Sequence, residues 1–184
     1  MTAQPARLFR RTSNAASAPA GSTLTRSEMA IAESVLYASL FDYPLTLAQL
    51  RQSLIESTQT PSEILQAYDC SPALQRVIDY HDGFFFPVGR ANLIDERKRR
   101  EARSRAFLRR HGLFLSLVCA IPYVKMVALS GSIAHLNLEG DGDLDLFIVT
   151  RGRRVWATTV AAVLLAKLLR RRRIVCANFV LADS

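Results

Sequence analysis

The sequence predicts an α+β protein in which a domain of alternating helices and strands follows a smaller helical unit. Two observations carry this prediction. Apolar residues recur at helical spacing in the first half of the chain, and three apolar runs of strand length lie in the second half. From Ala91 onward the expected order is helix, strand, helix, strand, helix, strand, which is the pattern of a layered domain.

Composition divides the 184-residue chain into three parts. Residues 1–25 are rich in Ala, Ser and Arg and lack acids, so we expect a disordered basic tail rather than a transit peptide. Residues 26–90 form the helical unit and residues 91–184 the layered domain. The formal net charge of +8 favours polyanionic partners such as nucleic acid, nucleotides or a membrane surface.

The sequence indicates a cytoplasmic protein without a transmembrane segment. The longest apolar stretch, residues 155–169, is shorter than the roughly 20 residues that span a bilayer, and it contains Lys167. The cysteines are odd in number and lack metal-ligand spacing, so we expect reduced structural thiols at Cys70, Cys119 and Cys176.

Start and stop signals place three short helices in the helical unit. Ser27 is the expected N-cap of the first helix, and Thr46 can cap the second. Residues 57–69 are expected to form a polar connection with at most a turn of helix. Ser71 and Pro72 then open the third helix, with its apolar side chains facing inward.

An Asp82-Gly83 turn after the third helix leads into a strand that contains three phenylalanines. Three helices followed by such a strand are typical of a winged helix-turn-helix, in which the third helix reads DNA. Its only cation here is Arg76, which is poor for gripping phosphates. A helical module that packs on the second domain or on a partner gives the same pattern.

A long helix is predicted over residues 91–118, with Gly112 as the point where it would break and an apolar, buried end over 113–118. Its first half is strongly basic, which fits either a track for a phosphate backbone or a solvated helix that bridges two domains. The cations are Arg97, Lys98, Arg99, Arg100, Arg103, Arg105, Arg109 and Arg110.

The residues with the clearest chemical pattern lie between 127 and 150. An apolar run ends in a Ser-Gly-Ser turn, and a second one opens with Asp-Leu-Asp. Residues two apart on a strand share a face, so Asp143 and Asp145 are expected side by side, where they suit hard divalent cations. Gly131 permits a tight strand-to-helix turn, and Ser132 lies at a helix start, where backbone amides bind anions.

Other common motifs do not account for this stretch. The alternating aspartates resemble the start of an EF-hand loop, but Leu146 stands where that loop needs Gly, and Gly152 where it needs Glu. No Gly-x-Ser-x-Gly elbow of a serine hydrolase is present. The three histidines, His81, His111 and His135, lack a second His or Cys at ligand spacing.

Gly131-Ser132, a short helix, and Asp143-x-Asp145 at the head of a strand resemble the signature of the DNA polymerase beta-type nucleotidyltransferase superfamily. Residues 27–184 resemble bacterial nucleotidyltransferase-domain proteins in which a winged-helix unit precedes that core. The resemblance implies a small mixed sheet with flanking helices. It also implies transfer of a nucleoside monophosphate from an NTP to an acceptor hydroxyl with Mg²⁺.

By the same resemblance, Asp143 and Asp145 would be catalytic Mg²⁺ ligands, and Gly131 and Ser132 would hold the nucleotide's triphosphate. Such proteins usually supply a third carboxylate from a later strand.

The last predicted strand, residues 174–181, contains Asn178 but no acid, so Asp183 just beyond it is the candidate for that third carboxylate. The chain stops at Ser184, where relatives continue into further helices, which favours a truncated or partial form.

The predicted function is therefore a Mg²⁺-dependent nucleotidyltransferase acting on a nucleic acid, a protein side chain or a small metabolite. The net positive charge and the missing strand carboxylate motivate an alternative, a non-catalytic nucleic-acid-binding or antitoxin-like regulatory protein on a decayed transferase core. A third interpretation is a structural subunit that supplies a docking surface to another chain.

Overall fold

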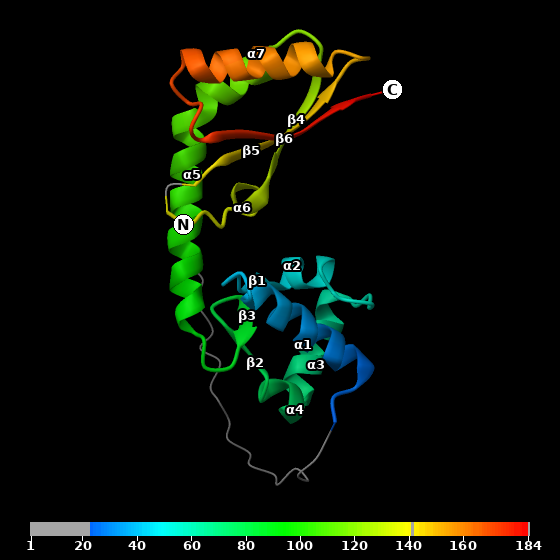
Figure 1. Cartoon of the computed structure of the whole chain (residues 1–184). Helices are drawn as coiled ribbons and strands as arrows, with labels where there is room; N and C mark the ends of the chain where they lie inside the picture. Colours follow the sequence, from blue (N-terminus) through cyan, green and yellow to red (C-terminus); the bar gives the residue numbers. More distant parts are fainter. Residues whose placement is uncertain (1–22, 141, 184) are drawn as a thin grey trace, which may run out of the picture.

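The computed structural model describes residues 23–140 and 142–183 and has a mixed α+β architecture with two three-stranded sheets (Figure 1). The long helix α5 (Asn92–Cys119) runs alongside both sheets and connects the two halves of the chain. The predicted basic tail lies outside the described residues, apart from its last three positions.

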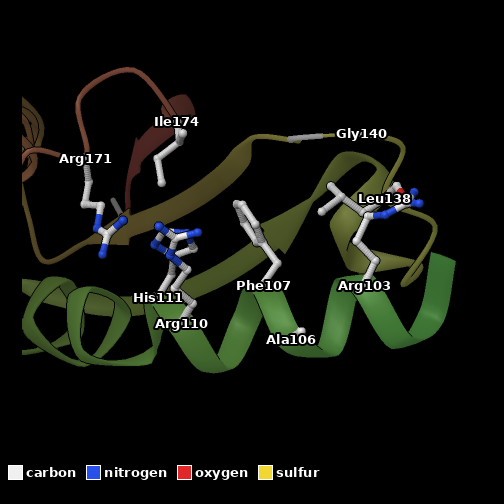
Figure 2. A pocket seen from close by; sticks show the side chains of 9 residues that line it. All are labelled: Arg103, Ala106, Phe107, Arg110, His111, Leu138, Gly140, Arg171 and Ile174. Atoms are coloured by element: carbon white, nitrogen blue, oxygen red, sulfur yellow. The ribbon is translucent and has the colours of Figure 1, made fainter. Parts of the chain in front are cut away.

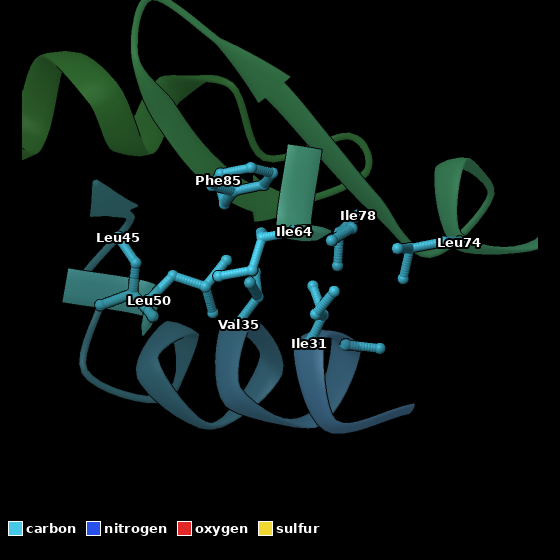
Figure 3. Packing of buried hydrophobic residues seen from close by; sticks show 9 residues of the cluster. Ile31, Val35, Leu45, Leu50, Ile64, Leu74, Ile78 and Phe85 are labelled. Carbon is cyan, nitrogen blue, oxygen red and sulfur yellow. The ribbon is translucent and has the colours of Figure 1, made fainter. Parts of the chain in front are cut away.

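The first half contains four helices and three short strands around one core. The sheet has the order β1-β3-β2 with antiparallel pairs, and the side chains of Ile31, Leu50, Ile64, Leu74 and Phe85 are fully buried beneath it (Figure 3). The elements in chain order are α1 (Arg26–Ser39), β1 (Leu45–Thr46), α2 (Leu47–Gln52), α3 (Pro61–Cys70), α4 (Pro72–Gln75), β2 (Ile78–His81) and β3 (Phe84–Pro87).

Hydrogen bonds between side chains and backbone start these helices. Thr25, and not the predicted Ser27, is the N-cap of α1, because its side chain and that of Glu28 form a reciprocal capping box. The predicted cap at Thr46 is confirmed. A third capping box at Thr60 starts α3, so the expectation of a mostly irregular connection over residues 57–69 is wrong.

The prediction of a third helix after Ser71 is wrong except for its first turn. After Ser71 and Pro72 the chain makes only the four-residue α4, and then continues as strand β2. Ile78 is buried as expected, but it belongs to this strand, which pairs with β3 through a two-residue turn at Asp82 and Gly83. Both turn residues have positive φ, at 52° and 83°.

The second half is a mixed sheet of order β4-β5-β6, in which β4 is antiparallel and β6 parallel to β5. The predicted strands and helices are present here within a residue or two of their expected ends. After α5 they are β4 (Val124–Ser130), α6 (Gly131–Ala134), β5 (Leu144–Thr150), α7 (Val155–Leu168) and β6 (Val175–Ala182).

Alternating residues of β5 assign the two faces of this sheet. Leu144, Leu146 and Ile148 are fully buried and pack with Phe114 of α5 and Ala166 of α7. Side chains at the intervening positions point to the opposite face. The helices therefore cover one face of the sheet, and the residues between the buried leucines lie on the other.

Helix α5 is continuous through Gly112, so the predicted break does not occur. Its apolar end is buried only in part: Phe114 and Val118 face the core, whereas Leu113 is 71% exposed. Helix α7 likewise turns its small residues inward and its large ones outward. Thr158, Ala162 and Ala166 are buried, and the exposed large side chains are Trp156, Val160, Leu164 and Leu168.

The basic half of α5 bridges the two halves of the chain. Arg97 is buried against the ring of Tyr43, with 3.6 Å between the guanidinium carbon and the ring centroid. Arg100 is also buried and forms ion pairs with Asp42, Glu96 and Glu139. These contacts favour the bridging-helix interpretation over a phosphate track for this part of the helix.

Cys70, Cys119 and Cys176 are free thiols, and all three are exposed. Within the described part of the chain, no helix combines the length and apolarity needed to cross a membrane.

Replacing Arg100 with Ala is expected to lower the free energy of unfolding by about 1.5–3 kcal/mol, because the charged hydrogen bonds of its buried guanidinium group to three partly exposed carboxylates are lost. The matched control is Arg99→Ala. Arg99 forms an exposed pair with Glu96, and its loss is expected to cost about 1 kcal/mol or less. Urea unfolding of both variants measures the difference, and equal losses would contradict a special role for Arg100.

Candidate functional site

The candidate site lies where β4 ends and β5 begins. Ser130 pairs with Asp145 across the two strands, and Gly131 follows immediately as the first residue of α6. Gly131 has a φ of +66°, and a Cβ placed on it would overlap Oδ2 of Asp145. Glycine is thus required twice, by the backbone conformation and by the carboxylate beside it.

The two aspartates flank Leu144, which is fully buried in the core. Asp145 is half-buried at the second position of β5, and Asp143 is exposed just before the strand. The Asp145 side chain lies on the face opposite Leu144. Asp143 precedes Asp145 by two residues, about 6–7 Å away at Cα where the chain is extended. Ser132 is exposed in the first turn of α6.

Strand β6 contributes Asn178, a residue to which the sequence pattern assigned no role. Its Nδ2 atom donates a hydrogen bond of 2.9 Å to Oδ1 of Asp145. Oδ1 of Asn178 accepts a contact of 2.8 Å from the thiol of Cys176, the residue that pairs with Asp145. An amide therefore stands on the neighbouring strand where the resemblance leads one to expect a third carboxylate. The sequence signal for this role was the spacing of Cys176 and Asn178, which are two residues apart and therefore share a face of the predicted strand.

The structure does not bring Asp183 to the aspartate pair. Because β6 runs parallel to β5, residue 182 pairs with Thr150 at the far end of the sheet, roughly 16 Å along the strand from Asp145. There Asp183 forms an ion pair with Lys125 and accepts a hydrogen bond of 2.6 Å from the amide of Gly152. These two interactions lower the pKa of Asp183. Asp183 therefore does not supply a third carboxylate to the aspartate pair, contrary to the prediction from the sequence.

The donor set at the site fits a magnesium ion that also binds phosphate. Mg²⁺ is usually held by one or two protein carboxylates, with substrate phosphates and water completing an octahedron. Asp143 and Asp145 supply two carboxylates, and no ion pair found among the described residues includes either of them. Residues 23–140 and 142–183 contain no group of three or more His, Cys, Asp or Glu suited to a metal.

The loop between α6 and β5 is held from two sides. From the first half of the chain, the hydroxyl of Tyr43 donates to the carbonyl of His135 at 3.0 Å, and the carbonyl of Phe41 accepts from Asn137 at 3.0 Å. From α5, the hydroxyl of Ser104 accepts from the amide of Leu138 at 3.1 Å. The segment that joins Ser132 to Asp143 is therefore positioned by the helical unit as well as by the sheet.

Charge is distributed unevenly between the two halves. Residues 23–88 contain three arginines, no lysine and eight acids, whereas residues 91–183 contain seventeen Lys and Arg and eight acids. Helix α3 carries Glu63 and Asp69 and no cation. This distribution argues against contact between α3 and a phosphate backbone.

Comparisons of the chain with models of known protein families, with curated proteins and with solved structures give no match. The function is therefore inferred from the residues and contacts of the site itself.

Replacing Gly131 with Ala is expected to destabilise the fold and displace the Asp145 carboxylate, because the added methyl group overlaps Oδ2. Gly152→Ala is the matched control: Gly152 has a similar φ of +58°, but nothing lies within 4 Å of a Cβ placed on it. In each variant the left-handed backbone costs about 1–2 kcal/mol. Thermal unfolding should show the larger loss for Gly131→Ala, and equal losses would contradict the Asp145 contact.

Proposed function

We propose that this chain is a Mg²⁺-dependent nucleotidyltransferase of the DNA polymerase beta type, with its NTP site at the junction of β4, α6 and β5. The observation that carries the proposal is the packing of the Asp145 carboxylate against Gly131. This contact brings a metal-binding carboxylate next to a strand-to-helix turn whose first backbone amides lack partners within the helix. Asp143 and Ser132, the neighbours of this contact in the sequence, are both exposed.

The architecture is compatible with this proposal in both halves. A mixed sheet with an antiparallel first pair and a parallel last strand, covered on one face by helices, leaves the aspartate face for substrate. The first half has a helix, a strand, three helices and a closing hairpin, with sheet order β1-β3-β2. This order supports a winged-helix unit, interrupted by the short α4.

In the proposed reaction, an acceptor hydroxyl oxygen attacks the α-phosphorus of the NTP, the new P–O bond forms in line, and pyrophosphate leaves. Asp143 and Asp145 would hold Mg²⁺, which when bound neutralises charge on the phosphates. The amides of Gly131 and Ser132, with the Ser132 hydroxyl, would orient the triphosphate. Asn178 fixes the orientation of Asp145 through its hydrogen bond.

Asn178 also favours a second candidate function. An amide cannot accept the proton of an attacking hydroxyl, and Asp183 lies at the other end of the sheet. A protein that binds a nucleotide or nucleic acid without transferring a nucleoside monophosphate would need the aspartate pair and its turn, but no third carboxylate. The basic second half would then supply the phosphate contacts.

The double variant Asp143→Asn/Asp145→Asn tests the transferase proposal with isosteric changes. Transfer of label from an α-phosphate-labelled NTP to acceptors in a cell extract is expected to fall about 100-fold or more, because the metal loses both carboxylates. The matched control is Asp183→Asn, which should retain transfer. Undiminished labelling in the double variant would refute the proposal.

The variant Asn178→Asp distinguishes the two functions. A third carboxylate next to Asp145 should strengthen Mg²⁺ binding about tenfold, as measured by calorimetry with Mg²⁺ and a non-hydrolysable NTP analogue. In a transferase the same change should raise the rate of label transfer, because a proton acceptor is added. Tighter Mg²⁺ binding with no transfer in either form favours the non-catalytic function. The control Asn178→Ser should do neither.

A further inference from the structure

A second polar cavity lies on the helix-covered side of the mixed sheet, away from the aspartate face. It has a volume of about 460 Å³ and is open to solvent on one side; α5, the loop that precedes β5 and the turn that follows α7 line it (Figure 2). Arg103, Phe107, Arg110 and His111 come from α5, and Arg171 comes from the turn. None of the described residues that line it is acidic.

His111 is the feature that marks this cavity as more than a basic surface. The residue is only 3% exposed, and its Nδ1 atom is buried without a hydrogen-bond partner among the described residues. Nδ1 has almost no accessible surface, so a ligand in the cavity would reach it only after the ring rotates. That pairing would then recover the free energy that an unpaired buried polar atom costs. His111 lies well inside α5.

The surroundings of His111 favour a neutral ring and an anionic ligand. Burial lowers the pKa of His111, and the positive charges of Arg171 and Arg110 lower it further. The same two guanidinium groups approach from opposite walls of the cavity (Figure 2). A ligand with two or more anionic oxygens would pair with both arginines and accept a hydrogen bond from the imidazole in its Nδ1-protonated tautomer.

The remaining walls fit an aromatic ring. Phe107 lies next to His111, with 4.4 Å between ring centroids, and offers a flat apolar surface inside the cavity. Arg103 is fixed at the far end, because its Nη1 atom donates to the carbonyl of Leu138 at 3.1 Å. The volume lies within the range of small-molecule sites.

We propose that this cavity binds a phosphate ester of mononucleotide size. Its phosphate would lie between Arg110 and Arg171 against Nδ1 of His111, and its heterocyclic ring would pack on Phe107. The site is distinct from the proposed NTP site, because neither aspartate and neither residue of the Gly131-Ser132 turn lines this cavity. It does not depend on the proposed transferase function.

Isothermal titration calorimetry of the full chain with AMP tests the proposal. AMP is expected to bind at a single site, and to bind more tightly than either adenosine or inorganic phosphate. Arg110→Gln and Arg171→Gln should each weaken binding roughly tenfold. Their matched controls are the neighbouring arginines that do not line the cavity, Arg109→Gln and Arg172→Gln, which should change the affinity less than about twofold.

A second measurement does not depend on a folded variant of the buried histidine. In a ¹⁵N-labelled sample, the Nδ1 resonance of His111 should shift on addition of AMP, and the shift should persist in Asp143→Asn/Asp145→Asn. Absence of AMP binding, equal losses in Arg109→Gln and Arg110→Gln, or loss of the shift in the aspartate variant would each overturn the proposal. Tighter binding of a short single-stranded RNA than of AMP at the same arginines would assign the cavity to a nucleic-acid backbone, and would also overturn it.

Discussion

The buried guanidinium group of Arg100 holds the two halves of the protein together. It pairs with Glu96 on its own helix, with Asp42 in the first half and with Glu139 in the loop before β5, at N–O distances of 2.8, 3.4 and 2.6 Å. A buried cation is costly without partners, so these ion pairs favour the arrangement in which the three segments lie together. The loop that leads to Asp145 is one of them, and the candidate site therefore depends on contacts outside the sheet.

A second constraint acts at the site itself. Antiparallel pairing of Ser130 with Asp145 brings the strand-to-helix turn and the carboxylate to the same end of the sheet. Only glycine at position 131 leaves room for that carboxylate, and Asn178 orients it from the other side. The position of Asp145 is thus determined by three neighbouring strands, which is the kind of support that a preorganised binding site needs.

Local signals in the sequence were sufficient for the strands around the site, because each is an apolar run bounded by Gly, Asp or Arg. They were insufficient for α3, whose only fully buried residue is Ile64, so its apolar pattern is short. The role of Asn178 and the distance to Asp183 could not be predicted either. Both depend on the register in which β6 pairs with β5. The strand–helix–strand order indicates parallel pairing, but the register, with its shift between Leu146 and Phe147, is set by non-local contacts.

The two halves of the chain differ in charge, and this difference assigns them different roles: the second half carries the proposed phosphate-binding residues, and the first half positions them. In the first half of the chain acids outnumber arginines, and its contacts with Arg97, Arg100 and the loop before β5 are structural. The cations that line the second cavity, Arg110 and Arg171, belong to the basic half, as does the aspartate pair. A polyanionic ligand would therefore meet attractive potential on the second half and repulsion from the first. Both proposed phosphate-binding sites therefore lie on the sheet domain. The charge distribution favours a role for the helical unit in orienting the site rather than in binding phosphate.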